Sequence, residues 1–249
     1  SRSGCLRRSK HDWRPALLPR WWRKRSDYWK SDILLKYSSK GGTGKTTAAL
    51  QVALYLLVQK KAKVCLVDAD VQGSSNLAIQ SREKNLVSPK LRTEVITDGG
   101  EILTRVPKLN EKYEYVVIDV GGRETDALRA SMAICDTLLI PCRPTGLDLL
   151  AFTLNIRDVI QKAREEAGAK FKAFVFISQA HTRMTKNDHE VVQFLRSLDD
   201  IKYVDAKLTS RVVFEEAGNH GLSVYEMKPR NEKACAEVRH LVNQTVLAK

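Results

Sequence analysis

The stretch SSKGGTGKTT, residues 38–47, decides the fold of this chain. Its residues Gly44, Lys45 and Thr46 form the G-K-[ST] ending of a phosphate-binding P-loop. An apolar run, DILLKYSS, precedes it, and TTAALQVALYLLVQKK, with the length and residue types of a buried helix, follows it. Strand, Gly-rich loop and helix in this order aim backbone N–H groups at phosphate oxygens. The stretch therefore predicts nucleotide binding, and no N-K-x-D stretch indicates guanine specificity.

Further apolar runs alternate with helical patterns. Strands are expected at 62–70, 113–120, 136–142 and 172–178, with a weaker one at 201–206. Helices are expected at 123–134, 147–166, 186–198, 211–219 and 231–247, whereas residues 80–112 favour neither element. This alternation predicts an α/β fold of three layers, a parallel twisted β-sheet flanked by helices on both faces, as in P-loop NTPases.

Composition is that of a globular protein with one main domain. Of 249 residues, 43% are hydrophobic and 29% charged, and no apolar run reaches the roughly 18–20 residues of a membrane span. We therefore expect no stable membrane insertion and a cytoplasmic location. The five cysteines are scattered and never spaced C-x-x-C, which predicts core thiols in a reducing compartment: Cys5, Cys65, Cys135, Cys142 and Cys235.

Positive charge and tryptophan are concentrated at the start of the chain. The formal net charge is +13, and residues 1–40 hold 12 Lys/Arg against 3 Asp/Glu. All four tryptophans also precede residue 31. We therefore expect residues 1–31 to be a basic, Trp-rich leader, disordered or foreign to the domain, and residues 32–249 to be the P-loop ATPase domain. A basic aromatic arm of this kind is also suited to gripping nucleic acid.

Acidic residues end two of the expected strands. Asp119 ends the run YVVID, as a Walker B aspartate does when it holds the Mg²⁺ shell. Asp68 and Asp70 end CLVDAD, and ligands of open α/β sheets bind outside the carboxyl ends of the strands. Together with the Thr46 hydroxyl, Asp119 and Asp70 are therefore the candidate residues for a Mg²⁺ site.

The motif KGGTGKT resembles the deviant Walker A motif, K-G-G-x-G-K-[ST], of the ParA/MinD group of ATPases. VDADVQGSS is similar to the D-x-D-x-Q-G segment of that group, and VVIDVGG to its Walker B strand. DTLLIPCRPTGLDL and SRVVFEEAGNHGLSVYEMKPRNEKACAEV resemble later parts of its members, so the resemblance covers roughly residues 32–248. Two departures are Thr43, where valine is common, and Gly121-Gly122, where two prolines are frequent.

The resemblance implies an ATPase that uses ATP and Mg²⁺ and forms an ATP-sandwich homodimer. It implies that Lys40 reaches across the dimer to the partner's nucleotide, that Asp70 positions the attacking water, and that Lys45 and Asp119 complete the catalytic set. The ATP-binding residues it implies are Lys40, Gly41, Gly42, Thr43, Gly44, Lys45, Thr46 and Thr47.

Within the group, the chain is most similar to small ParA-type partition ATPases. Residues 1–31 are too short for a helix-turn-helix domain, and the paired cysteines of iron–sulfur relatives are missing. The resemblance then implies a nucleoid-associated dimer that binds DNA without sequence preference and is stimulated by a ParB-type centromere-binding protein. The candidate DNA contacts are Arg211, Lys228, Arg230, Lys233 and Arg239.

A MinD-like membrane-associated positioning ATPase is the alternative. It would bind lipid through the last helix, which carries an apolar stripe: Ala234, Val238, Leu241, Val242 and Val246. Such a stripe is more typical of a helix that packs on the core of its own domain.

Overall fold

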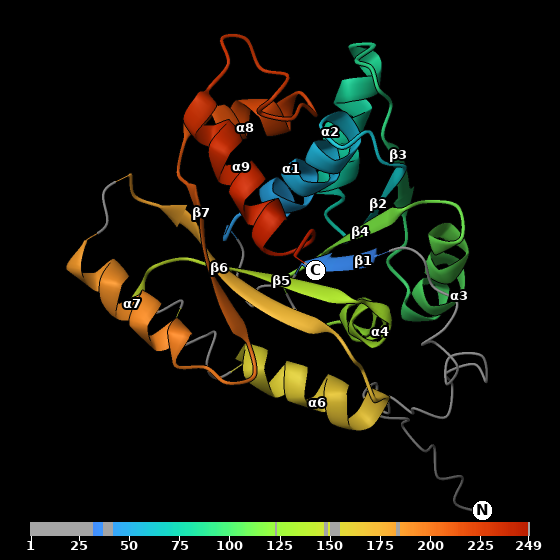
Figure 1. Ribbon diagram of the computed structural model, residues 1–249. Coiled ribbons are helices and arrows are strands. Elements are labelled where there is room, and N and C mark those ends of the chain that lie inside the picture. Colours follow the sequence, from blue (N-terminus) through green and yellow to red (C-terminus); the bar gives the residue numbers. More distant parts are fainter. Residues whose placement is uncertain are drawn as a thin grey trace, which may run out of the picture.

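The computed structural model describes residues 32–36, 42–122, 124–146, 149, 155–182 and 185–248. In this part of the chain seven strands form one sheet in the order β3-β2-β4-β1-β5-β6-β7, with every neighbouring pair parallel (Figure 1). The strands are β1 Asp32–Lys36, β2 Val64–Ala69, β3 Arg92–Val95, β4 Tyr115–Val120, β5 Thr137–Cys142, β6 Lys172–Ala180 and β7 Lys202–Thr209. The predicted fold class is confirmed.

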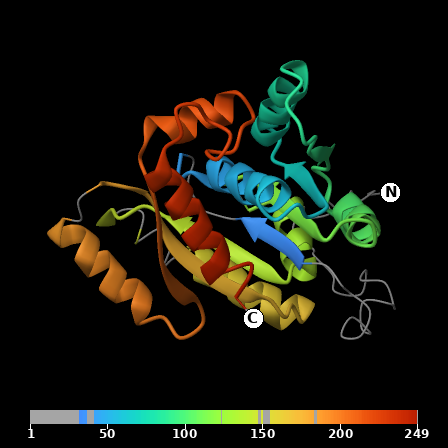
Figure 2. The same ribbon diagram turned by 45° about the horizontal axis from the view of Figure 1, so that its top comes forward.

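Helices cover both faces of the sheet. Their bounds are α1 Lys45–Val58, α2 Ser74–Lys84, α3 Gly99–Asn110, α4 Asp126–Ile134, α6 Arg157–Ala167, α7 Lys186–Arg196, α8 Val212–Asn219 and α9 Glu232–Gln244. The helices α1, α2, α8 and α9 cover one face and α3, α4, α6 and α7 the other (Figure 2). Side chains of the first group join one buried cluster, and those of the second group join another. Because apolar layers lie on both sides, β2 and β5 are buried at every position, which explains their continuous apolar sequence.

Residues 80–112, which favour neither element in sequence, contain the end of α2, the strand β3 and the helix α3. The strand β3 is short and lies at the edge of the sheet, so none of its four residues is fully buried. The helix α2 buries few residues, and two of them are the polar Ser75 and Arg82. Elements that bury so little apolar surface leave no clear period in the sequence.

The other expected elements are found with shifted ends. The weak strand exists and continues to Thr209, as β7. The helix expected over 147–166 is described as α6 from Arg157, and residues 147–148 and 150–154 lie outside the described residues. The helix expected from 123 begins at Asp126, because the Thr125 side chain caps it by accepting a hydrogen bond from a backbone N–H of its first turn.

The apolar stripe of α9 faces the core. Its five members are at most 8% exposed: Ala234, Val238, Leu241, Val242 and Val246. They pack in the cluster that also contains α1 and β7, so the core-facing interpretation of this stripe is confirmed. Among the described helices, none is both long and apolar enough to cross a membrane. Cys65, Cys135, Cys142 and Cys235 are buried free thiols, as expected, and Cys5 lies outside the described residues.

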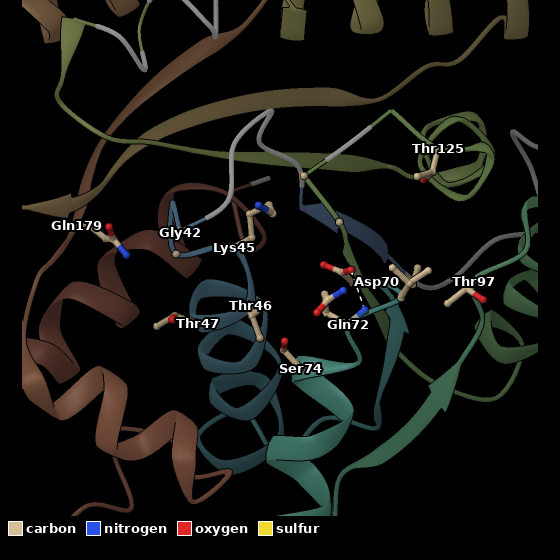
Figure 3. Close-up of a pocket in the computed structure, with 15 residues that line it drawn as sticks. Gly42, Lys45, Thr46, Thr47, Asp70, Gln72, Ser74, Thr97, Thr125 and Gln179 are labelled. Carbon is tan, nitrogen blue, oxygen red and sulfur yellow. Dashed lines mark hydrogen bonds between the residues drawn. The ribbon is translucent and has the colours of Figure 1, made fainter. Parts of the chain in front are cut away.

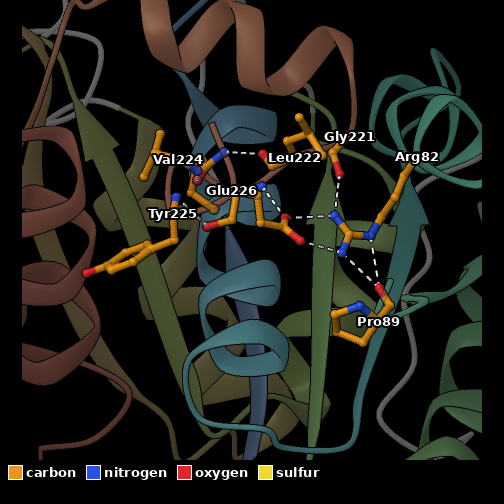
Figure 4. Close-up of polar contacts among 9 residues, drawn as sticks. Arg82, Pro89, Gly221, Leu222, Val224, Tyr225 and Glu226 are labelled. Carbon is orange, nitrogen blue, oxygen red and sulfur yellow. Dashed lines mark hydrogen bonds and ion pairs between the residues drawn. The ribbon is translucent and has the colours of Figure 1, made fainter. Parts of the chain in front are cut away.

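A buried arginine joins α2 to the loop that precedes α9 (Figure 4). Arg82 is 0% exposed and forms five hydrogen bonds, as many as a guanidinium has donors. Its Nη1 and Nη2 donate to the two carboxylate oxygens of Glu226, both at 2.8 Å. The carbonyl oxygens of Pro89 and Gly221 accept the other three bonds. We call these four residues the Arg82 corner.

The same loop is also held by the P-loop helix. Gln51 of α1 is 0% exposed, and its amide group donates to the Leu222 carbonyl and accepts from the Val224 N–H, both at 2.9 Å. The loop of residues 221–226 is thus attached to α1 through Gln51 and to α2 through Arg82. These two helices carry the nucleotide-site loops at their N-termini.

Candidate nucleotide-binding site

The P-loop is shaped by two glycines in the left-handed region. Gly42 has φ of 72° and Gly44 has φ of 80°, and Gly44 is the residue that precedes the first turn of α1. A Cβ on Gly44 would lie 2.7 Å from Ser178 Oγ, so both the backbone angle and the space require glycine. Lys40 and Gly41, predicted for this loop, lie outside the described residues.

A cavity of about 750 Å³ opens at the carboxyl ends of the strands (Figure 3). The loop before α1, the 69–74 segment after β2 and the 121–122 segment after β4 form its walls. Its lining residues are Gly42, Gly44, Lys45, Thr46, Thr47, Ala69, Asp70, Val71, Gln72, Ser74, Thr97, Gly121, Gly122, Thr125 and Gln179. The structure therefore brings the described P-loop residues and Asp70 to one cavity, and Thr43 lies buried beneath them at 2% exposure.

Lys45 is a cation at this cavity. It is 8% exposed, and burial lowers the pKa of its ammonium group more than the nearby Asp119 and Asp70 carboxylates raise it. Burial is costly for an ammonium group because it removes water from the charge. Triphosphate oxygens placed in this cavity would add the negative charge that Lys45 is positioned to meet.

The three aspartates differ in their surroundings. Asp68 is 0% exposed and accepts hydrogen bonds from the backbone N–H groups of Asp70 at 3.1 Å and Asn76 at 2.8 Å. It therefore shapes the turn from β2 into α2. Asp70 lines the cavity, and its Oδ1 accepts from the Gln72 N–H at 3.0 Å. Asp119 is 1% exposed and lies opposite Asp68 in the register of β2 and β4.

The departure at Gly121 makes room for Asp70. A Cβ on Gly121 would lie 3.2 Å from Cγ and Oδ1 of Asp70, tighter than ordinary van der Waals contact. The glycine thus lets the carboxylate approach the backbone that follows β4. The sequence departs from the frequent prolines at the position where the structure needs this space.

A Mg²⁺ ion bound with ATP takes oxygen ligands from one or two carboxylates, a hydroxyl and the phosphates. Thr46 and Asp70 line the cavity, and Asp119 lies at the end of the neighbouring strand β4. Among the described residues, no group of three or more His, Cys, Asp or Glu side chains is arranged to hold a metal alone. This donor set fits an ion that is carried largely by the nucleotide.

A second cavity of about 400 Å³ adjoins the first and shares Gly44, Thr46, Thr47, Ser74 and Gln179 with it. Its remaining lining comes from α1, α2, β6, β7, α8 and the residues between β7 and α8, and it mixes apolar with polar side chains: Leu50, Ala78, Ser178, Leu208, Thr209, Ser210, Arg211, Phe214, Glu215, Gly218 and Asn219. The apolar members, Leu50, Ala78, Leu208 and Phe214, lie next to the phosphate cavity and suit a nucleotide base. The P-loop motif alone does not reveal these residues. They could have been found only from their positions at strand ends and in α8.

The candidate DNA contacts lie around α9. Arg211 is only 20% exposed and forms an ion pair with Glu237 at 2.9 Å, so its charge is directed into the domain. Arg230 pairs with Glu232 at 2.9 Å and lies over the Tyr225 ring. Lys228, Lys233 and Arg239 are exposed. Four of the five candidates therefore reach solvent, and Arg211 is mainly an internal partner.

Comparison with known proteins places this geometry in a family. The family profile described as the CobQ/CobB/MinD/ParA nucleotide binding domain matches residues 36–224, which is most of the chain. The protein belongs to this family. The resemblance to ParA/MinD ATPases is thereby confirmed, and the protein is a nucleotide-binding P-loop ATPase.

Several members are similar over nearly their full length. The Maintenance of carboxysome distribution protein A of Halothiobacillus neapolitanus is 28% identical over 222 residues, covering 87% of this chain and 97% of that protein. Protein ParA of Rhizobium radiobacter is 20% identical over 210 residues, covering 84% and 91%. The septum site-determining protein MinD of Pyrococcus horikoshii, solved with Mg-ADP, superposes with a TM-score of 0.65 at 17% identity, covering 84% and 94%.

Proposed function

We propose that the protein is a partitioning ATPase that binds ATP and Mg²⁺ as a sandwich homodimer and, in that state, binds DNA without sequence preference. In this proposal Lys45 and the loop from Gly41 to Thr47 bind the phosphates, and Thr46, Asp70 and Asp119 hold the Mg²⁺ shell. A ParB-type partner stimulates hydrolysis and releases the dimer from DNA. The protein then acts in the cytoplasm, on the nucleoid.

The observation that supports nucleotide chemistry best is that Lys45, Thr46 and Asp70 line one cavity. Lys45 stabilises the negative charge on the phosphoryl group that is transferred, and bound Mg²⁺ would neutralise the phosphate oxygens further. The Asp70 carboxylate orients the water that attacks this group. In the dimer, Lys40 of one subunit reaches the nucleotide of the other and adds a second cation.

DNA rather than lipid is the proposed surface because of the core position of α9. The apolar stripe that a membrane-binding helix would present to lipid is at most 8% exposed. Exposed cations on and before the same helix, Lys228, Lys233 and Arg239, are suited to phosphate contacts. A dimer would present two copies of this surface, which raises affinity for a polyanion.

Asp70→Ala tests the cycle. The variant removes the proposed water-orienting carboxylate and leaves the phosphate cradle whole, so it is expected to bind ATP, to lose most hydrolysis and to accumulate as a dimer that holds DNA. Gel filtration with Mg-ATP and affinity for two unrelated duplexes across a salt series measure these effects. Asp98→Ala, at the N-cap of α3, is the matched control and is expected to hydrolyse ATP normally.

The DNA arm of the experiment separates the two proposed surfaces. Affinity for both duplexes is expected to fall with salt, with a log–log slope of about 0.9 per phosphate neutralised. Binding to DNA that is the same with ATP, with ADP and without nucleotide contradicts the proposed cycle. ATP-dependent flotation with anionic liposomes, without DNA binding, would support the MinD-like alternative instead.

The similarity to the carboxysome distribution protein favours a second candidate for the cargo. In that version the ATP and DNA cycle is unchanged, but the partner is an adaptor on a large protein body rather than a ParB-type protein on a centromere. Identifying which protein stimulates hydrolysis by the purified ATPase distinguishes these cargoes.

A further inference from the structure

Arg143 lies against the P-loop but belongs to neither the motif nor the cavity walls described above. It is the first residue after β5, and its side chain is half-buried. Its Nη2 lies 3.7 Å from the position that a Cβ on Gly42 would take. Its Nε donates a hydrogen bond to Gln179 Oε1. Within the part of the chain that the structure describes, no carboxylate pairs with this guanidinium.

Gln179 holds Arg143 in this position at a cost in backbone energy. It has φ of 52°, in the left-handed region that side chains other than glycine and asparagine rarely adopt. It also lies in a register shift between β6 and β7, where Ser178 and Ala180 pair with successive residues of β7 and Gln179 is the extra one. A bulge of this kind re-aims a side chain, and strained residues of this kind cluster at functional sites.

The Gln179 side chain also lies close to the P-loop (Figure 3). Its Cγ lies 3.7 Å, and its Nε2 3.9 Å, from where a Cβ on Gly44 would be. Gln179 therefore lies beside the loop at Gly44, while its side-chain carbonyl oxygen accepts the hydrogen bond from Arg143. A third cavity, of about 450 Å³, is lined by both residues, which leaves space beside the guanidinium.

The position of Gly42 shows which end of a nucleotide Arg143 would meet. Thr46 and Thr47 line both the phosphate cavity and the second cavity, whereas Gly42 lines the phosphate cavity and is absent from the second. With the base in the second cavity, the phosphate chain extends past Thr47 and Thr46 toward Lys45 and Gly42. The last phosphate is then the one nearest to Gly42.

We propose that Arg143, held by Gln179, contacts the terminal phosphate of ATP bound to its own subunit and makes the site favour ATP over ADP. This inference rests on the proposed function, because it takes the cavity to be the ATP site. A guanidinium is always charged, and its planar donors match phosphate oxygens. ADP lacks the group that Arg143 would contact, so the contact contributes to binding of the triphosphate alone.

The test compares Arg143→Gln with the wild-type protein in dilute solution, where dimerisation does not contribute. Fluorescent ATPγS and fluorescent ADP are titrated separately, which reports binding without hydrolysis. Arg143→Gln is expected to weaken ATPγS binding roughly 10- to 100-fold, as for a lost hydrogen bond to a charged group, and to leave ADP binding within about 2-fold. Arg196→Gln, an exposed arginine on α7, is the matched control and keeps the wild-type ratio of the two affinities.

Two further variants distinguish a direct contact of Arg143 with the phosphate from the positioning of Arg143 by Gln179. Asparagine adopts the left-handed backbone conformation of Gln179, but its side chain is shorter. Gln179→Asn is therefore expected to lower the ratio of ATPγS affinity to ADP affinity, but less than Arg143→Gln does. Arg143→Lys keeps the charge and is expected to restore part of the ratio. Thermal melting of each variant identifies any that does not fold, and the ratio in the remaining variants then decides.

An unchanged ratio in the folded variants overturns the proposal, including the case in which both nucleotides bind more weakly by the same factor. That case makes Arg143 a support of the P-loop. If the wild-type protein binds neither nucleotide, the proposed function itself fails, and this result is seen before any variant is compared.

Discussion

Two buried cations, Arg82 and Lys45, are held in opposite ways. Arg82 is 0% exposed, and the Arg82 corner bonds all five of its donors. Lys45 is 8% exposed, and burial lowers its pKa despite the nearby Asp119 and Asp70 carboxylates. Five hydrogen bonds hold the first cation in the fold, whereas burial disfavours the charge of the second. Buried charge therefore stabilises the fold in one region and prepares it for a ligand in the other.

The first test removes the satisfied cation. Arg82→Met is expected to lower the free energy of unfolding by about 3–5 kcal/mol, because Glu226 and two backbone carbonyl groups lose their buried partner. Urea unfolding measures this change. Arg92→Met is the control, because Arg92 is 60% exposed and pairs with Glu94 on the surface, where ion pairs contribute little. Equal stability of the two variants would show that the Arg82 corner does not anchor the loop.

The second test uses one glycine from each region. Gly221 has φ of 62°, and a Cβ there would lie 2.1 Å from the Ala78 carbonyl oxygen. Gly73 has φ of 64°, and a Cβ there would have no neighbour within 4 Å. Gly221→Ala is expected to lower the free energy of unfolding by about 2–4 kcal/mol, through backbone strain and overpacking together.

Gly73→Ala introduces backbone strain without overpacking, so it is expected to lower the free energy of unfolding by about 1 kcal/mol. Both variants are compared by urea unfolding under the same conditions. The difference between them measures how tightly the loop at Gly221 packs on α2. A difference near zero would mean that α2 moves away from the loop at little cost.

The third test removes the cation that burial disfavours. Lys45→Met keeps a similar volume without the charge; burial disfavours that charge whereas the nearby Asp119 and Asp70 carboxylates favour it, so the free energy of unfolding is expected to change less than for Arg82→Met. Nucleotide binding is expected to be lost, since the main contact to the phosphates is gone. Thermal unfolding and ATPγS titration measure the two effects. A large loss of stability would place Lys45 with Arg82 as a structural cation.

The pH dependence of the third test follows from the lowered pKa of Lys45. Between the folded pKa and the ordinary value of 10.5, the unfolded state binds the proton more often than the folded state does. Stability of the wild-type protein therefore gains from rising pH in that window. Any advantage of Lys45→Met over wild type is expected to shrink there, as measured by urea unfolding at several pH values without nucleotide.

Some residues of the candidate site could be predicted from the sequence. The P-loop glycines, Lys45, Thr46 and the strand-end aspartates were predicted as site residues from the sequence, because phosphate binding demands particular residue types at short spacing. Gly42, Gly44, Lys45, Thr46 and Asp70 line one cavity, as expected of a parallel sheet whose carboxyl strand ends meet at one edge. The role of Asp68 as an acceptor for two backbone N–H groups became clear only from the hydrogen bonds.

Other residues had no local signal. Arg82 looked like any charged residue of a polar helix, and its partner Glu226 lies 144 positions later in the chain. Arg143 and Gln179 are 36 positions apart, and although Arg143 lies within the stretch DTLLIPCRPTGLDL, nothing in the sequence connects the two residues. The weak pattern over residues 80–112 has the same origin, since an edge strand and a sparsely buried helix need few apolar residues.

By itself, the sequence determined that a parallel α/β sheet carries a phosphate-binding loop and acidic strand ends, because those features depend on near neighbours along the chain. Only the tertiary structure decided that the apolar stripe of α9 packs on the core, that five hydrogen bonds hold Arg82, and which side chains reach the P-loop from β5 and β6. These depend on contacts between distant segments. Their energies come from burial and hydrogen-bond geometry, which no short stretch of sequence encodes.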